Sequence, residues 1–204
     1  MQQGSLPQSS SGLVARELTL DDERLLQDFF VDNPAYFHIV HGCSPQPDEA
    51  RNEIEDALPE GWSFTRKWKI GYFDASGRLL AVASVVTDLL ALTVWHIGLF
   101  MLAAPLTGTG LAHQLHLELE NWAAGHGARW LRLSVVAGNV RAQRFWQACG
   151  YIEARTREGI ELGQLRHRVH IMVKPLFQGT LADYLELMPR DRAEGSLPVL
   201  SKPA

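Results

Sequence analysis

Apolar and polar residues follow helical spacing in some parts of the chain and strand-like spacing in others. Apolar positions predict a first helix over about 21–31, where Thr19 and early acidic residues suit a helix N-terminus. A second helix is predicted from 47 to about 58. The segment between them, 32–46, has prolines and a glycine among aromatic residues and histidines, which predicts a loop.

The middle of the chain predicts an antiparallel hairpin followed by a more buried strand. Residues 64–89 have two arms rich in β-branched and aromatic residues on either side of a turn at 74–77. The apolar run 93–103 predicts a third strand. After it, apolar positions recur at helical spacing over 111–123, and two glycines follow as a helix end.

The last third of the chain predicts further strands around a short helix. The strands are expected at 129–136, 151–156 and 168–174. The helix begins after Asn139, places its apolar residues on one face and ends at Gly150.

This order of elements predicts one α/β domain with a mixed, mostly antiparallel central sheet flanked by helices. We expect a disordered N-terminal lead over 1–13 and the folded domain over 14–176. The remaining residues, 177–204, are expected to form a tail with one short helix and a loose end.

Composition excludes several classes of partner. The chain has 204 residues, 46% hydrophobic and 21% charged, with a formal net charge of -4 and no polybasic stretch. We therefore expect no nucleic-acid or membrane partner. Cys43 and Cys149 lie far apart, so neither a disulfide framework nor a metal site is predicted. With no signal peptide or membrane span in the sequence, the protein is expected to be cytoplasmic.

The segment PLTGTGLA, residues 105–112, joins the predicted buried strand to the helix behind it. The first N–H groups of a helix lack intrahelical partners, and glycines allow an anion to approach them closely. Gly108 and Gly110 suit such an anion cradle, although a simple tight turn explains the spacing equally well. Neither common nucleotide-binding motif is present. His113 stands where G-x-G-x-x-G requires its third glycine, and the sequence has no G-x-x-x-x-G-K-[ST].

Two motifs in order resemble the GNAT (GCN5-related N-acetyltransferase) superfamily. Gly108, Gly110 and Ala112 occupy the small-residue positions of its glycine loop, although Thr107 stands where the family often has Gln or Arg. The segment 139–151 then matches N-x-x-A-x-x-F-Y-x-x-x-G-[F/Y], with Trp at the Tyr position. The resemblance covers about 14–176 and implies the GNAT acyltransferase fold.

The resemblance implies an acetyl-CoA-dependent N-acetyltransferase in which an amine attacks the thioester directly. The backbone of Leu102 and Ala103 would bind the pantetheine arm, and Asn139 would contact the same arm or a nearby water. The pyrophosphate would lie on the turn formed by Gly108, Thr109, Gly110, Leu111 and Ala112.

The catalytic groups depart from the family pattern. Gly98 stands where a carboxylate is often found, and Trp146 replaces a phenol with an indole, which cannot act as a general acid. His96 lies two residues before Gly98 on the same strand face, so we expect it to serve as the base or as an ordinary strand histidine. Trp146 is expected to form an apolar wall, with Phe145 packing into the core behind it.

The polar residues of the helix behind the glycine turn favour a solvated role. His113 and His116, like Glu118 and Glu120, fall on its predicted polar face. Cys149 is most simply a small buried group.

The acceptor is expected to be a small-molecule primary amine, bound near Tyr36 and His38 in the predicted loop. No pattern in the sequence names that amine, and the oligomeric state, a homodimer included, is left open. The missing phenol and carboxylate leave a second function open, that of an acyl-CoA-binding sensor or interaction protein with little or no transfer activity.

Overall fold

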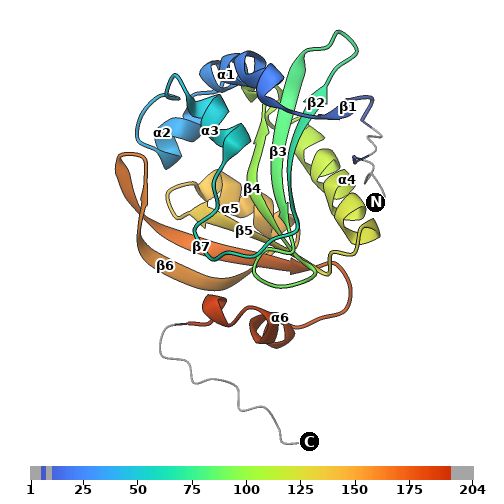
Figure 1. Cartoon of the computed structure of the whole chain (residues 1–204), viewed down its shortest axis with the longest axis vertical. Helices are drawn as coiled ribbons and strands as arrows, with labels where there is room; N and C mark the ends of the chain where they lie inside the picture. Colours follow the sequence, from blue (N-terminus) through green and yellow to red (C-terminus); the bar gives the residue numbers. More distant parts are fainter. Residues whose placement is uncertain (1–5, 8–10, 194–204) are drawn as a thin grey trace, which may run out of the picture.

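The protein folds around one seven-stranded sheet (Figure 1). The computed structural model describes residues 6–7 and 11–193. The sheet order is β1-β2-β3-β4-β5-β7-β6, and only the β4–β5 pair is parallel among the strand pairs of these residues. The strands are β1 Val14–Glu17, β2 Arg66–Phe73, β3 Leu79–Thr87, β4 Val94–Leu102, β5 Trp130–Val136, β6 Ile152–Leu162 and β7 Leu165–Pro175. The expected mixed, mostly antiparallel sheet is confirmed.

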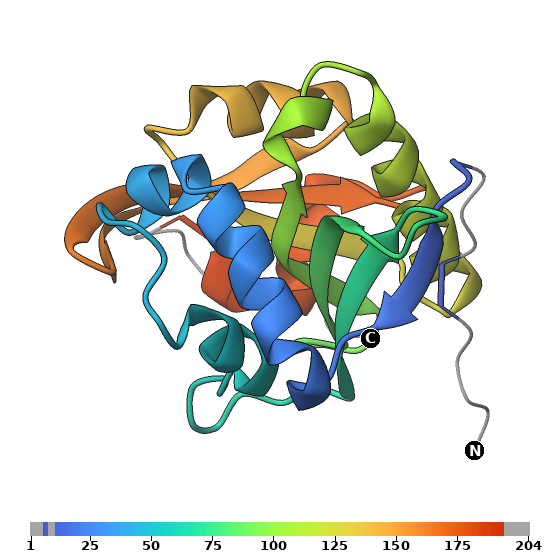
Figure 2. The same ribbon diagram turned by 90° about the horizontal axis from the view of Figure 1, so that it is seen from above.

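Helices cover both faces of the sheet (Figure 2). The α4 and α5 helices pack on one face, whereas α1, α2, α3 and α6 lie on the other. The helices are α1 Glu23–Asp32, α2 Ala35–Val40, α3 Glu49–Glu55, α4 Leu111–Gly125, α5 Val140–Ala148 and α6 Leu181–Leu187. Short 3-10 turns are η1 Leu20–Asp22, η2 Ala104–Leu106 and η3 Pro189–Asp191.

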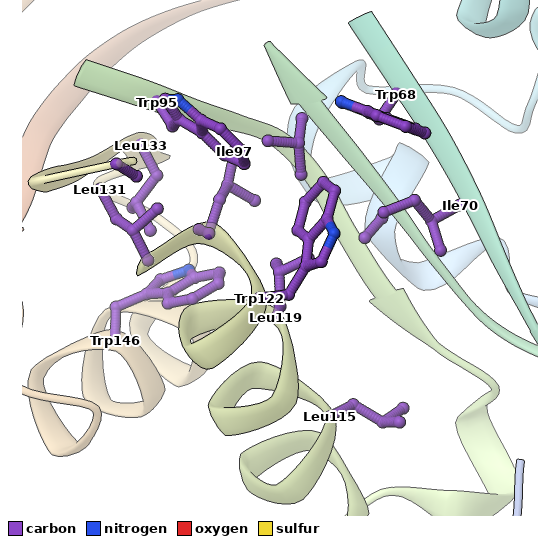
Figure 3. Close-up of a cluster of buried hydrophobic side chains, with 14 of the residues drawn as sticks. Trp68, Ile70, Trp95, Ile97, Leu115, Leu119, Trp122, Leu131, Leu133 and Trp146 are labelled. Carbon is purple, nitrogen blue, oxygen red and sulfur yellow. The ribbon is translucent and has the colours of Figure 1, made fainter. Parts of the chain in front are cut away.

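The larger core lies between the sheet and α4 (Figure 3). Leu115, Leu119 and Trp122 follow the helical repeat and are buried against the strands. The Trp122 ring makes edge contacts with Trp68 on β2 and Trp95 on β4, at centroid distances of 5.5 and 5.2 Å. These large rings tie the hairpin, the central strand and the helix into one packed unit.

The predicted loop over 32–46 is wrong in part, because it contains α2. Pro34 precedes the helix and Gly42, at φ +75°, follows it, so the residues that favour a loop instead bound a six-residue helix. Its formation is driven by packing, since Phe37 and Val40 are buried. The β1 strand was not predicted, and β6 and β7 extend beyond their predicted bounds.

Both terminal segments contact the domain. Leu6 and Leu13, in the lead expected to be disordered, pack against the main core. The predicted helix of the tail is α6, and its Tyr184 packs with Met188 against β4, β5 and β7. The loose end expected after it, and most of the N-terminal lead, lie outside the described residues.

Asp191 anchors the tail to the sheet. It is fully buried, and both of its oxygens accept hydrogen bonds from Arg132 of β5, at 2.8 and 3.1 Å. The Tyr184 hydroxyl donates to Asp191 at 2.6 Å, and Arg157 of β6 lies 3.2 Å from it. Burial would raise the pKa of Asp191, but the hydrogen bonds and charge of Arg132 prevail and hold it below its ordinary value.

We expect Asp191→Ala to destabilise the protein by about 3–5 kcal/mol at pH 7, because Arg132 would be left buried without its carboxylate. The measurement is urea unfolding, with Asp183→Ala at the exposed start of α6 as the control. Since the folded pKa of Asp191 is depressed, its contribution is present above about pH 4 and is lost as the pH falls through the folded value. Equal losses in the two variants at pH 7 would contradict this anchoring role.

Candidate active site

Strands β4 and β5 part in the middle of the sheet. They pair in parallel only from Val94–Ile97 on β4 to Trp130–Leu133 on β5. On β3, Ser84 pairs with Leu99 and Val85 pairs with Ile97, so Gly98 has no partner there. This irregularity is a β-bulge. Beyond it β4 continues with β3 and β5 continues with β7. The sheet therefore opens between its central strands.

The unpaired edge of β4 presents backbone groups to this opening. Leu102 pairs with Ala81, and the Ala103 amide donates to the Leu80 carbonyl at 2.8 Å. In an antiparallel pair this pattern turns the N–H and C=O of Leu102 away from β3 and toward the opening. The Ala103 carbonyl accepts from Leu106, so both backbone groups of Ala103 are already engaged. Leu102 is thus well placed for its predicted contact, whereas Ala103 is not.

The glycine turn at the end of β4 exposes amide groups. Gly108 and Gly110 have φ of +79° and +87°, and a Cβ built on either meets no atom within 4 Å. Among the described residues, no backbone carbonyl accepts a hydrogen bond from the amides of Gly108, Gly110 or Ala112. The Thr109 hydroxyl donates to the Leu106 carbonyl at 2.7 Å and accepts from the Leu111 amide at 3.4 Å. Thr109 therefore braces the turn and leaves its glycine amides open.

Arg141 brings a positive charge to this turn. Its guanidinium donates to the Thr107 hydroxyl at 2.8 Å, from the first turn of α5. Thr107 lacks the long polar side chain common at its position, and Arg141 supplies a cation from another element. Sequence reasoning did not identify Arg141, since only the fold brings 107 and 141 together.

Asn139 begins α5. Its Oδ1 accepts a hydrogen bond from the Ala142 amide at 3.1 Å, which is the geometry of a helix N-cap. This contact accounts for the side-chain oxygen, and the predicted contact of Asn139 with a pantetheine arm stays a prediction.

A cavity of about 180 Å³ lies on the other side of the opening, between β4 and the α1–α3 layer. Its lining residues are Phe30, Tyr36, Phe37, His41, Glu49, Asn52, Glu53 and Leu99. Tyr36, which is predicted to contact the acceptor, is one of them, whereas His38 is exposed, contacts Ser44 at 3.2 Å and does not line the cavity. Burial, with the charges of Glu53 and Glu49, raises the pKa of Tyr36, so its hydroxyl stays protonated.

Glu53 is held at this cavity by two polar residues of the sheet. Lys69 of β2 donates to its Oε1 at 2.6 Å, and the Ser84 hydroxyl of β3 donates to the same oxygen. Ser84 is also the residue nearest to a Cβ built on Gly98, at 3.9 Å. A carboxylate therefore lies beside the bulge, although it comes from α3 and not from β4.

Comparison with known proteins agrees with this geometry. The profile described as Acetyltransferase (GNAT) family matches residues 25–151. The chain belongs to this family. Comparison with curated protein sequences gives no significant match.

Solved GNAT-like structures share the fold at low sequence identity. An acetyltransferase from Thermus thermophilus is 21% identical with a TM-score of 0.64, over 82% of this chain and 99% of that one. A spermidine N-acetyltransferase from Vibrio cholerae, in complex with CoA and spermine, is 16% identical with a TM-score of 0.62, over 86% and 99%. The ribosomal-protein-S18-alanine N-acetyltransferase from Escherichia coli is 16% identical with a TM-score of 0.57, over 82% and 96%.

In this GNAT protein, the surroundings of His96 are unfavourable for a general base. The Arg132 guanidinium can only donate, and it lies 3.2 Å from Nδ1 of His96. Nδ1 is therefore the acceptor and Nε2 carries the proton, so a neutral ring has no free lone pair for an amine proton. Burial lowers the pKa of His96 to about 3, and the charge of Arg132 acts in the same direction.

Trp146 is a core residue. It is 7% exposed and contacts Phe100, Phe145 and Tyr151 at centroid distances of 5.7, 4.8 and 5.2 Å. Phe145 is the more exposed ring and stacks on Phe100 of β4. The predicted arrangement, with Phe145 behind Trp146, is therefore reversed. The family's phenol position is occupied here by a packing indole.

The expected solvated role of His116 is wrong. It is 2% exposed, and its Nε2 lies 3.1 Å from the Tyr151 hydroxyl. Burial lowers the pKa of His116 to about 3, with Lys174 acting in the same direction. Glu120 bonds Lys174 of β7, and Glu118 is buried as well. Tyr151 and Lys174 of β7 contact His116 and Glu120, and the Ser11 amide donates to Glu118 at 3.2 Å, whereas His113 is exposed as expected.

No described helix has the length and apolar content that crossing a membrane requires. Within the described residues, no three His, Cys, Asp or Glu side chains are grouped as a metal site would need.

We expect the His96 ring to stay neutral between pH 5 and 8, because burial and Arg132 oppose its protonation. Its ring protons, assigned by their loss in His96→Asn, should not shift in an NMR titration over that range. The same ring should titrate near pH ~6.5 when the protein is unfolded in urea. A native-state titration near neutral pH would restore His96 as a candidate base.

Proposed function

We propose that this protein is an acetyl-CoA-dependent N-acetyltransferase that acts on a primary amine of a small molecule. The observation that carries the proposal is the opening between β4 and β5, which leads to a turn with open amides. A thin, amide-containing chain fits along an unpaired strand edge, and a pyrophosphate fits the amides at the start of α4. The residues present thus suit acetyl-CoA.

Three groups of this chain would hold acetyl-CoA. The backbone of Leu102 hydrogen-bonds the pantetheine arm, and the amides of Gly108, Gly110 and Ala112 bind the pyrophosphate. Arg141 adds a guanidinium beside them, which compensates for the short side chain of Thr107. Acetyl-CoA supplies the acyl thioester.

Glu53 replaces the carboxylate that is missing at Gly98. Its carboxylate lines the acceptor cavity beside the bulge and attracts an incoming ammonium. A nucleophilic amine must lose a proton, and Glu53 accepts it directly or through one water. His96 takes no part in this step because its Nδ1 is occupied by Arg132.

No strong general acid is required at Trp146. A thiol has a pKa near ~8.5, so a thiolate departs at neutral pH without full protonation in the transition state. The buried indole shapes the wall around the opening with Phe100 and Phe145. The missing phenol is therefore compatible with turnover.

The acceptor cavity favours a cationic amine. Glu49 and Glu53 line it together with the Tyr36 ring. The fold neighbours include proteins named for spermidine and for the alanine of a ribosomal protein, so the fold serves both small and macromolecular amines. A cavity of about 180 Å³ suits a small-molecule amine.

The alternative is an acyl-CoA sensor with little or no transfer. Both functions require CoA binding, but only the enzyme releases free CoA in an amine-dependent manner. Thiol release measured across a panel of diamines, amino acids and monoamines distinguishes the two. The carboxylate of Glu53 beside the opening favours the enzyme.

We expect Gly110→Glu to abolish acetyl-CoA binding, because it places a side chain and a negative charge where the pyrophosphate belongs. Calorimetry should detect binding in the wild type and none in the variant, while the far-UV spectrum stays native. Gly127→Glu, which has a similar positive φ at the far end of α4, is the control for backbone strain and should retain binding. Equal affinity in both variants would overturn the proposed cofactor site.

Glu53→Gln should lower kcat/KM for the best amine by ~10² or more and leave the KM for acetyl-CoA nearly unchanged. The amide keeps the size of the side chain but removes the charge and the proton acceptor. His38→Ala, outside the cavity, should have little effect on either parameter. If Glu53→Gln is as active as the wild type, or weakens both substrates equally, the assignment of Glu53 is wrong.

A further inference from the structure

A second cavity, of about 380 Å³, lies between β6 and the η3 turn. It is lined by Arg155, Arg157, Glu158, Ile160 and Arg190. Arg157 is in register with Val169 and Arg155 with Ile171, and both partners pack with Val40 of α2. Residues in register share a face of the sheet, so this cavity is on the same face as the acceptor cavity.

The arginines are held in place by the tail. Arg155 and Arg157 donate to the Arg190 carbonyl at 2.8 and 3.0 Å. The Arg190 guanidinium stacks on the Trp62 ring, 4.1 Å from its centroid. Long side chains that are already ordered lose little conformational entropy when a ligand binds.

Two buried donors of this cluster are unused by the protein. No acceptor among the described residues bonds Nε of Arg157 or Nε of Arg190. Burial lowers the pKa of Arg157, and so do the positive charges of Arg190, Arg155 and Arg132. Only the negative charge of Asp191 acts in the opposite direction. Glu158 bonds Arg168 at 2.5 Å and so directs its charge toward that residue. The cavity therefore combines excess hydrogen-bond donors with mutual repulsion between cations.

We propose that this cavity binds the carboxylate or phosphate group of an anionic small molecule. The planar guanidinium fork suits bidentate recognition of either anion. Such a ligand accepts hydrogen bonds from the guanidinium groups that line the cavity and relieves the repulsion around Arg157. Its source is either an acidic group at the far end of the acceptor or a separate effector.

The cavity is linked to the opening of the sheet through buried groups. Arg157 contacts Asp191, Asp191 bonds Arg132, and Arg132 donates to His96 two residues before the bulge. If the anion belongs to the acceptor, that acceptor must be long enough to reach from Glu53 to the arginine cluster on the same face of the sheet. Occupation by a separate anion is transmitted along the same contacts.

The test is thermal unfolding in inorganic phosphate or glutarate, against sodium chloride of matched ionic strength. Wild-type protein should gain about 3 °C in Tm at ten times the Kd. Arg190→Gln and Arg157→Lys should each lose most of this gain, whatever their Tm without added anion. Arg78→Gln, on the exposed hairpin turn, should retain it with either anion, and Gly110→Glu, at the proposed pyrophosphate site, should retain it with glutarate.

Three results overturn the proposal: no anion-dependent gain in the wild type, a full gain in Arg190→Gln, or loss of the gain with glutarate in Gly110→Glu alone. The last would place the anion on the glycine turn. The melt needs no turnover, so its outcome is independent of acetyl transfer.

Kinetics then separate the two sources of the anion. If it belongs to the acceptor, 6-aminohexanoate should exceed hexylamine in kcat/KM by about tenfold or more, and Arg190→Gln should remove this preference. If it is an effector, phosphate should change both rates equally in the wild type and neither in Arg190→Gln. If the Tm responds to the anion but neither kinetic pattern is found, the cavity binds anions without influence on transfer. That result overturns the link between the cavity and the opening of the sheet.

Discussion

The separation of β4 from β5 at Gly98 is the constraint on which the rest of the site depends. A strand that leaves its neighbour exposes backbone donors and acceptors, which is costly in a buried sheet unless something else satisfies them. The bulge makes this separation local, because β3 continues to pair with β4 on the other edge. One open edge, ending in a turn with open amides, follows from that single irregularity.

The aromatic packing around the opening holds it in shape. Trp122 ties α4 to β2 and β4, and Trp146 ties α5 to Phe100. Because both helices are packed against large rings, the glycine turn and the start of α5 have a fixed relation. That relation brings Arg141 to Thr107.

The tail completes the opposite face of the sheet. A buried ion pair gains little in net stability over apolar packing, but it is costly to break once formed. Asp191 neutralises Arg132, and Arg132 in turn fixes the tautomer of His96. The same segment orders the arginine cluster. Acidic side chains from α3 and basic side chains from β6 and η3 thus lie on one face, which gives that face a charge asymmetry suited to a bipolar ligand.

The sequence by itself determined the order of most elements, the glycine turn and the family. These follow from local patterns: helical and strand periods, glycines at positive φ and a cap at Asn139. Predictions from the sequence were wrong where contacts between distant residues determine the local structure or the burial of a side chain. The α2 helix has weak local signals and forms because Phe37 and Val40 find a core. His116 and Glu118 of α4 are buried because distant residues, Tyr151 and Ser11, contact them.

The surroundings of the candidate site residues were decided only by the tertiary structure. No local pattern places Glu53 beside Gly98, Arg141 beside Thr107 or Arg132 beside His96, since each pair is far apart in sequence. A side chain's charge and free lone pairs depend on what the fold packs against it. The sequence therefore identifies candidate site residues by their type. The tertiary structure shows which of these side chains have their charges and lone pairs already paired with neighbours.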